Sequence, residues 1–397
     1  MNRRDFLKSV VAASAAPLWV RFGSLAAYAA EPAALPDHMV MVLYLGGGND
    51  GLNTVVPYLD SAYQKARPTV GLGAGDVNAL GGGLGLHKSL ARMYQMWGNS
   101  RLAIVQNVGY ANPSFSHFDS TFIYETASND FRYHTGWLGR YLDTTDAQAR
   151  GPVRAVAVGF DALPRTLIGE KSGGVALNSL SDFSWLDDGR ADVSLRRSAY
   201  AALNDNPTDG SMRAQILNAQ AQTVRAVSAV AGAARSTKGA LTPAQTVANL
   251  FAANIGLEIG FVQVGGFDTH TNEHGFQATG LTRVDTAIAE FFDAANQLGI
   301  YDRVSVLTFT DFGRRVGENA NAGTDHGSSG PLFVMGPQVR GGVYGARPDL
   351  SNSALDDGNL VPAIDMRSVY GSVLSGAFHV DPVPIMGGDF PLMPLIG

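Results

Sequence analysis

Acidic residues and histidines gather at the ends of short apolar segments that have the length of β-strands. They lie in VMVLYLGGGND, GFVQVGGFDTHTNEH, VSVLTFTDFG and GTDHG, which carry Asp50, Asp268, His270, His274, Asp311, Asp325 and His326. Strand ends in an open α/β sheet share one edge, and ligands bind at that edge. Because carboxylate oxygens and imidazole nitrogens bind divalent cations, we predict a site for Zn²⁺, Mn²⁺, Ca²⁺ or Mg²⁺ built from these residues.

Spacing within the segments adds detail and leaves alternatives open. Asp268 and His270 alternate, so an extended backbone points both side chains the same way, and His274 lies one helical turn beyond His270. Asp50 follows three glycines, and capping of a short helix is the alternative to metal binding. His326 is either a metal ligand or a general acid–base.

The segment NPSFSHFDST (112–121) follows the apolar run LAIVQNV and places hydroxyl groups at the turn into a helix. Ser116 and His117 lie where a nucleophile and its partner would lie, with Ser114 close by. A helix N-terminus helps to bind an anion such as phosphate or sulfate, and a hydroxyl nucleophile needs a base or a metal to activate it. Helix capping by Ser114 or Ser116 is the simpler alternative.

Two arginines follow Asp311 in TFTDFGRR. Arg314 and Arg315 could clamp an anionic substrate, and we name Arg314 as the candidate. The alternative is that one of these arginines forms a structural pair with a carboxylate.

Composition excludes several classes of function. The net charge is -6 and no basic tract exists, so nucleic-acid binding has little support. The chain has no cysteines, which excludes disulfides, thiolate metal sites and cysteine nucleophiles.

The first residues read as an export signal. Asn2-Arg3-Arg4-Asp5-Phe6-Leu7-Lys8 resembles the twin-arginine motif, an apolar run follows, and Ala27-Tyr28-Ala29 offers a cleavage site. We predict a signal peptide over 1–29, passage through the twin-arginine translocase, and a periplasmic or secreted mature protein. No later segment is apolar for the length that a membrane-spanning helix needs, so no stable span is expected.

Apolar runs near 39–45, 102–108, 153–158, 260–264, 304–310 and 331–335 predict strands. Helical patterns lie between several of them, which predicts an α/β fold with a mostly parallel sheet. The Gly-rich stretch 70–85 is expected to be a surface loop. Residues 188–247 are Ala- and Gln-rich and predict a helical insertion within a single domain, 30–397.

Together the motifs resemble the exported DUF1501 family over essentially the whole chain. The resemblance rests on GGNDGLNTVVPY, SHFDS, TGWLGRYLD (135–143), GFDTH, TFTDFGRRVGEN, GTDHG and FVMGPQVRGGVYGARPDL (333–350). It implies a relation to the alkaline phosphatase and sulfatase superfamily, whose fold is a three-layer α/β/α sandwich with metal ligands at strand ends.

The resemblance also implies roles for individual residues. Asp50 matches the first-strand metal aspartate, the turn 114–117 matches the position of the nucleophile, and His326 looks like the last metal histidine. Phe312 stands where the superfamily has the histidine of an Asp-His pair, so a two-metal site lacks a ligand there unless Asp325 supplies it. With no cysteine and no C/S-x-P-S-R motif, a standard sulfatase is not expected.

Two functions follow from these patterns. The first is a metal-dependent hydrolase of small phosphate or sulfate esters, in which a metal polarises the ester. The second is a non-catalytic exported protein that retains the fold for binding or structure.

Overall fold

The computed structural model describes residues 35–144, 153–178, 230 and 240–397. Chain packing divides the protein into two compact units, residues 33–176 with 239–397 and residues 1–32 with 177–238. The first unit contains the central sheet and the helices that cover it. The predicted signal peptide, 1–29, lies outside the described residues, and so does the predicted insertion near 188–247 apart from Val230 and 240–247. Residues 243–247 form the start of a helix, α9 (Pro243–Ala252). The prediction of one domain over 30–397 stays a prediction.

A nine-stranded mixed sheet forms the centre of this unit, in the order β13-β5-β12-β9-β1-β8-β6-β7, with β16 also paired to β5. Its strands are β1 (Met39–Gly46), β5 (Leu102–Gly109), β6 (Ala155–Val158), β7 (Val175–Leu177), β8 (Ile259–Gly265), β9 (Val304–Thr310), β12 (Gly330–Met335), β13 (Gly342–Tyr344) and β16 (Ile364–Asp365). β12 runs antiparallel to both its neighbours, whereas β6, β8, β1 and β9 are mutually parallel. All six predicted strands are confirmed.

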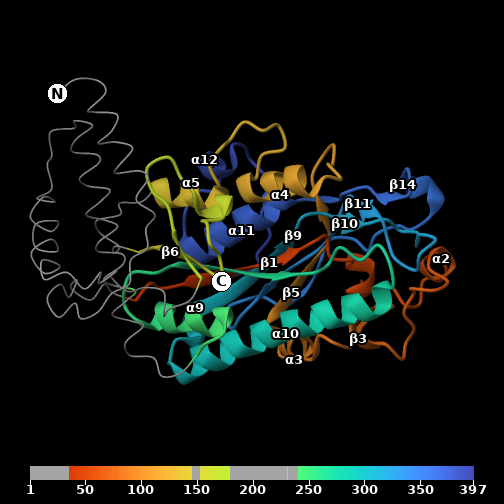
Figure 1. Ribbon diagram of the computed structural model, residues 1–397, viewed down its shortest axis with the longest axis horizontal. Coiled ribbons are helices and arrows are strands. Elements are labelled where there is room, and N and C mark those ends of the chain that lie inside the picture. Colours follow the sequence, from red (N-terminus) through yellow and green to blue (C-terminus); the bar gives the residue numbers. More distant parts are fainter. Residues whose placement is uncertain (1–34, 145–152, 179–229, 231–239) are drawn as a thin grey trace, which may run out of the picture. The chain divides into compact units, whose positions relative to one another are not determined.

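Helices cover both faces of the sheet, which gives the three-layer α/β/α arrangement expected from the sequence (Figure 1). One face carries α4 (His117–Thr126), α5 (Trp137–Thr144), α11 (Met366–Phe378) and the short α12 (Val383–Met386). The other face carries α3 (Ala91–Gly98), α9 (Pro243–Ala252) and α10 (Glu273–Gln297). None of the helices in the described part of the chain is both long and apolar enough to cross a membrane.

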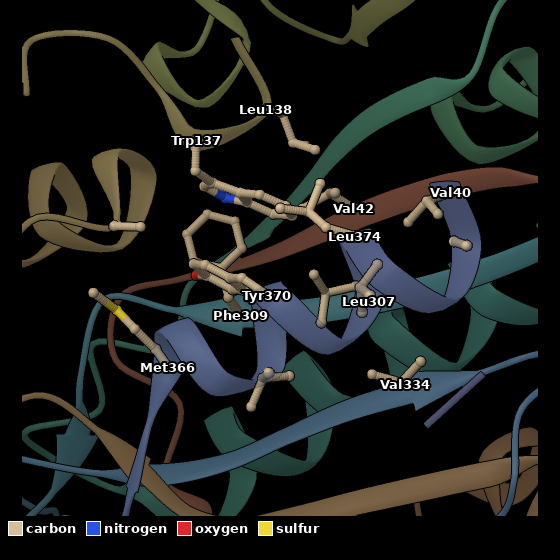
Figure 2. Close-up of a cluster of buried hydrophobic side chains, with 14 of the residues drawn as sticks. Val40, Val42, Trp137, Leu138, Leu307, Phe309, Val334, Met366, Tyr370 and Leu374 are labelled. Atoms are coloured by element: carbon tan, nitrogen blue, oxygen red, sulfur yellow. The ribbon is translucent and has the colours of Figure 1, made fainter. Parts of the chain in front are cut away.

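The core beneath α4, α5 and α11 follows from the alternation along the strands. Val40 and Val42 of β1 point to the same face and join a buried cluster with residues of β9, β12 and the covering helices. Figure 2 shows Trp137 lying flat against Tyr370 in this cluster, with ring centroids 4.4 Å apart. Ile123 and Tyr124 of α4 belong to the same cluster, which packs this helix against the sheet.

Smaller elements lie around the sheet. Helix α2 (Ser61–Ala66) stands beside a three-stranded sheet of β2 (Val55–Val56), β4 (Leu84–His87) and β3 (Val77–Gly81). The stretch 70–85, expected to be a loop, therefore contains a β-hairpin, in which Gly81, Gly82 and Gly83 supply the positive φ of a tight turn. Two further pairs are β10 (Gly313–Arg314) with β11 (His326–Gly327), and β14 (Leu355–Asp356) with β15 (Asn359–Leu360).

Candidate metal centre

The loops that carry the candidate residues begin at one edge of the sheet. β1 lies between β8 and β9, and the register pairs Gly46 with Gly265 and Leu45 with Thr310, so the three strands end at the same level. The loop after β1 must also fit against its neighbours. A Cβ added to Gly48 would lie 2.5 Å from the Phe312 ring, so the backbone approaches closely because this residue is glycine.

His117 is oriented by a carboxylate that lies behind it. Asp311 follows β9, and its Oδ2 is 2.6 Å from His117 Nδ1. The other oxygen, Oδ1, accepts hydrogen bonds from the Tyr44 hydroxyl at 2.9 Å and the Gly47 amide at 3.0 Å. Burial and the nearby Asp311 charge raise the pKa of Tyr44 well above its usual value, which keeps this hydroxyl a donor. In the neutral tautomer that donates its Nδ1 proton in a hydrogen bond to Asp311, the His117 ring presents a lone pair at Nε2.

Asp268 lies at the centre of the cluster and stays ionised. Its Oδ1 accepts a hydrogen bond from Arg314 Nη2 at 2.8 Å and lies 3.1 Å from His326 Nε2. Partial burial favours the neutral acid, but the hydrogen bond and the charge of Arg314 outweigh it and lower the pKa of Asp268 to about 2. About half of the Asp268 side chain is exposed, at 49%. This carboxylate is therefore charged and accessible.

His326 is placed by the β10–β11 pair, in which it stands opposite Arg314. Its Nδ1 is 2.8 Å from the Phe115 carbonyl oxygen, which can only accept, so Nδ1 carries the proton. Partial burial lowers the pKa of the His326 imidazole, which favours the neutral ring. In that form Nε2 is an acceptor, and it faces Asp268.

His270 completes the ring of side chains. Its Nδ1 is 3.2 Å from Asp325 Oδ1, and its Nε2 is 2.9 Å from His326 Nε2 and 3.0 Å from Asp268 Oδ1. Asp325 is itself held by the Asn319 amide at 3.1 Å. If Asp325 accepts the Nδ1 proton of His270, the Nε2 lone pairs of His270 and His326 face each other. That arrangement needs a cation or an extra proton between them.

These acceptors fit a bound metal ion. His117, Asp268 and His326 form the one group among the described residues whose ligand atoms all lie within 4.8 Å of one another. His117 Nε2 is buried without a hydrogen-bond partner and lies 3.5 Å from Asp268 Oδ1. Ligands bound at about 2.0–2.1 Å around a tetrahedral ion lie roughly 3.3 Å apart, close to these separations. The structure therefore contains a His/Asp site that can hold a metal.

Phe312 forms the apolar wall of the site. Its buried ring lies 4.6 Å from the His117 ring and 4.3 Å from the His326 ring, measured between centroids. The residue that stands in place of a histidine in the superfamily pattern thus packs against two candidate ligands and does not act as one. It restricts how both imidazoles can turn.

Asp50, predicted to be a metal ligand, lies elsewhere. Its carboxylate is completely buried and pairs with Arg67, with Nη1 to Oδ2 at 2.5 Å and Nη2 to Oδ1 at 3.1 Å. Oδ1 also accepts the Leu52 amide at 3.1 Å, which caps a 3-10 helix, Gly51–Asn53. Asp50 therefore has the helix-capping role that was the alternative to metal binding, because Arg67 already neutralises its charge.

Three further predicted site residues have other positions. Asp311 orients His117 and is not one of the clustered ligands. His274 is exposed on α10, near His87. Arg314 is buried, and besides Asp268 it donates to the carbonyl oxygens of Gly47, Gly48, Phe267 and Thr324. A guanidinium with these partners cannot clamp a substrate, so Arg314 acts through Asp268.

The serines are capping residues. Ser116 is the N-cap of α4, and its hydroxyl accepts the Asp119 amide at 3.4 Å. The Ser114 hydroxyl accepts the Ser116 amide at 3.2 Å. The turn that contains these serines nevertheless borders the cluster, because it also contains His117 and the Phe115 carbonyl oxygen that contacts His326.

The sequence reasoning missed Tyr44, Arg67 and Glu273. Tyr44 lies inside an apolar strand, where the surrounding residues do not indicate a role for its hydroxyl group. Arg67 is not part of a recognisable motif, although a lone arginine after a helix is an available partner for Asp50. Glu273 stands within the densest motif, TNEH, and its buried carboxyl accepts Asn53 Nδ2 at 3.0 Å and the Thr324 hydroxyl at 2.6 Å.

Comparison with known proteins supplies a family. The family model described as "Protein of unknown function (DUF1501)" matches residues 37–367. A search of curated proteins gives no significant match.

Solved structures show remote likeness. The chain is similar to alkaline phosphatase from the Antarctic bacterium TAB5 (11% identity, 78% of this chain and 94% of that chain, TM-score 0.33). It is similar to the lipoteichoic acid synthase LtaP from Listeria monocytogenes (9% identity, 97% and 79%, TM-score 0.33). It is also similar to Ps i-CgsB in complex with k-i-k-neocarrahexaose (9% identity, 89% and 72%, TM-score 0.39).

Proposed function

The chain belongs to the DUF1501 family, and we propose that it is a divalent-metal-dependent hydrolase of phosphate or sulfate esters that works at the His117–Asp268–His326 centre. One observation carries the proposal. The Nε2 atoms of two histidines and the Oδ1 of an ionised aspartate meet at a half-exposed point, and His117 Nε2 has no hydrogen-bond partner there. Such a set of acceptors is stable when a cation lies among them.

The donor set favours Zn²⁺. Imidazole nitrogens with one carboxylate oxygen suit Zn²⁺, whereas Ca²⁺ and Mg²⁺ prefer oxygen ligands. His117, Asp268 and His326 would hold the ion, and His270 is close enough to Asp268 and His326 to assist. A bound Zn²⁺ supplies a Lewis acid for the ester oxygen.

The residues around the centre prepare it for this task. Asp311 accepts the Nδ1 proton of His117 and so keeps Nε2 aimed at Asp268. Arg314 keeps Asp268 charged, and Phe312 closes the site toward the protein. The N-terminus of α4 begins at His117, and the positive end of its dipole favours an anionic ester beside the ion.

Export forms part of the proposal. The twin-arginine motif supports passage through the twin-arginine translocase, with a periplasmic or secreted location for the mature chain.

Metal content and turnover test the function together. The purified chain is stripped with a chelator and reloaded with Zn²⁺. Its metal content is then measured by mass spectrometry. The chain is then tested on 4-nitrophenyl phosphate, bis(4-nitrophenyl) phosphate and 4-nitrophenyl sulfate. His117→Ala, Asp268→Asn and His326→Ala should each lose metal and turnover, because each removes a converging acceptor. His379→Asn is the matched control. His379 is exposed at the C-terminus of α11, and asparagine tolerates its positive φ. Unchanged metal content in the three variants would refute the centre.

Ser116→Ala separates two routes of hydrolysis. Because the Ser116 hydroxyl caps α4, we propose that water is the nucleophile and expect the variant to keep most of its activity. A fall of several orders of magnitude would instead assign the nucleophile to Ser116.

A non-catalytic metal-binding role is the second candidate. The capping role of Ser116 and the burial of Arg314 favour it, because neither a free hydroxyl nucleophile nor a free guanidinium clamp is found where the sequence placed them. Tight Zn²⁺ binding with no turnover on the substrate panel would select this role.

A further inference from the structure

Two exposed aromatic residues flank His117 in the sequence. Phe115 and Phe118 flank it, and 44% and 90% of their surfaces are exposed. Phe122 stands one turn after Phe118 on α4, roughly 6 Å further along the helix. Phe122 is half-buried, with the Arg165 guanidinium 4.8 Å from its ring centroid, and its ring lies 5.5 Å from that of Phe131, which is 50% exposed. We call these four residues the phenylalanine row.

The row begins at the metal centre. The backbone carbonyl of Phe115 holds His326 Nδ1 at 2.8 Å, and His117, between Phe115 and Phe118, contributes its Nε2 to the cluster. Single exposed apolar residues are ordinary, but two exposed phenylalanines on either side of a candidate metal ligand mark a place where apolar groups can bind. None of the four side chains is needed to hold a candidate ligand.

We propose that the phenylalanine row binds the apolar alcohol portion of the ester, so that the substrate is an amphiphilic phosphate or sulfate ester with an aryl or alkyl group. This inference rests on the proposed function. The anionic group would lie at the His117–Asp268–His326 centre, and the apolar group would contact Phe115 and Phe118 and extend along α4 toward Phe122. Aromatic rings are suited to this role because they bury a large apolar area with few rotatable bonds.

The test compares esters that differ only in the apolar group. Hydrolysis of 1-naphthyl phosphate, decyl phosphate and methyl phosphate by the Zn²⁺-loaded chain is followed by release of inorganic phosphate. In the double variant with Phe115→Ala and Phe118→Ala, kcat/KM should fall at least about tenfold for an apolar ester. For methyl phosphate it should change less than about threefold, and metal content should stay at the wild-type value. A loss confined to the naphthyl ester indicates an aryl group, and a loss confined to the decyl ester indicates an alkyl group.

Phe276→Ala is the matched control. Phe276 is 56% exposed, but it lies on α10, on the opposite face of the sheet from α4 (Figure 1). This control should leave all three rates unchanged. Equal losses for the three esters in the double variant, or no loss for any, would overturn the inference while leaving the hydrolase proposal intact.

Binding measurements separate failure of the inference from failure of the function. If the wild type hydrolyses none of the esters, calorimetric binding of 1-naphthyl phosphonate, decyl phosphonate and methylphosphonate replaces turnover. Preference for the apolar phosphonates that the double variant loses supports the row as a ligand site in a non-catalytic protein. Absence of that preference refutes it. Binding of the wild type to phosphatidylglycerol vesicles, lost in the double variant with every rate unchanged, would assign the row to a lipid surface and also overturn the inference.

Discussion

Replacing Glu273 with glutamine should remove a specific part of the dependence of folding stability on pH. Glu273 and Asp50 are both buried beside Arg67. Burial, together with the charge of Asp50, raises the pKa of Glu273 to about 9. Burial also acts against ionisation of Asp50, but Arg67 outweighs it and lowers the pKa of Asp50. At neutral pH the trio therefore holds one guanidinium, one carboxylate and one carboxylic acid, with a net charge of zero.

The sign of the effect follows from proton linkage. In the unfolded chain Glu273 titrates near its ordinary pKa of 4.5, and in the folded chain near 9. Between these values the folded chain binds one more proton than the unfolded chain. The stabilisation is fully present below pH 4.5 and is lost as pH rises toward 9. The free energy of unfolding should therefore fall by up to about 1.4 kcal/mol per pH unit, or roughly 2–3 kcal/mol between pH 6 and 8.

Urea titrations of the wild type and Glu273→Gln at pH 6, 7 and 8, with chelator present, measure this effect. Glutamine is neutral throughout and can still bond Asn53 and Thr324. The stability of the variant relative to wild type should therefore rise across the series. Glu318→Gln is the control, because the amides of Thr69 and Val70 favour the ionised Glu318 and, despite some burial, lower its pKa. Its difference from wild type should not vary over this range. A constant difference for Glu273→Gln as well would refute the neutral carboxylic acid.

Asp50→Asn should destabilise the fold by about 3–5 kcal/mol, since it leaves the buried Arg67 guanidinium without its counter-ion; a change below 1 kcal/mol in urea titration would contradict this. Asp311→Asn should weaken Zn²⁺ binding by about 10- to 100-fold with the fold intact, since the carboxylate that orients His117 is lost; calorimetry showing wild-type affinity would remove Asp311 from this role. Arg3→Lys with Arg4→Lys should leave the precursor in the cytoplasm, because a receptor reads the paired arginines; normal accumulation outside the cytoplasm by cell fractionation would exclude twin-arginine export.

The strands were predictable because each is a mainly apolar run of strand length, and most of its residues are buried. The antiparallel direction of β12 was not, because an apolar run such as PLFVM reads the same way in either direction. The hairpin of β3 and β4 was also missed, since Gly and Asn residues hid an alternation in which Val77, Leu84 and Leu86 are buried. Hydrophobic pattern thus indicates that a strand exists, and the connections decide its direction and neighbours.

The sequence predicted where the candidate centre lies, but only some of the residues that form it. Parallel strands bring Asp268 and Asp311 to one edge whatever their side chains do, which the spacing after each strand already indicated. Which acid faces outward depends on partners from distant segments. Arg67 captures Asp50, and Tyr44 with Gly47 captures Asp311. None of these pairs is adjacent in sequence, so no motif could reveal them.

The number of donors around each acid separates a candidate ligand from a structural group at this edge. Asp311 accepts from a hydroxyl, backbone amides and an imidazole, and Asp50 accepts from a guanidinium and an amide, so a cation would have to displace bonds already made. Asp268 has Arg314 on one side, while its other close neighbours are imidazole nitrogens that point lone pairs toward it once their Nδ1 protons are placed. Acceptors that face acceptors are costly unless a cation joins them. If the proposed cation is bound there, its removal from the folded chain should draw protons onto the histidines, so metal release at constant pH should be accompanied by proton uptake.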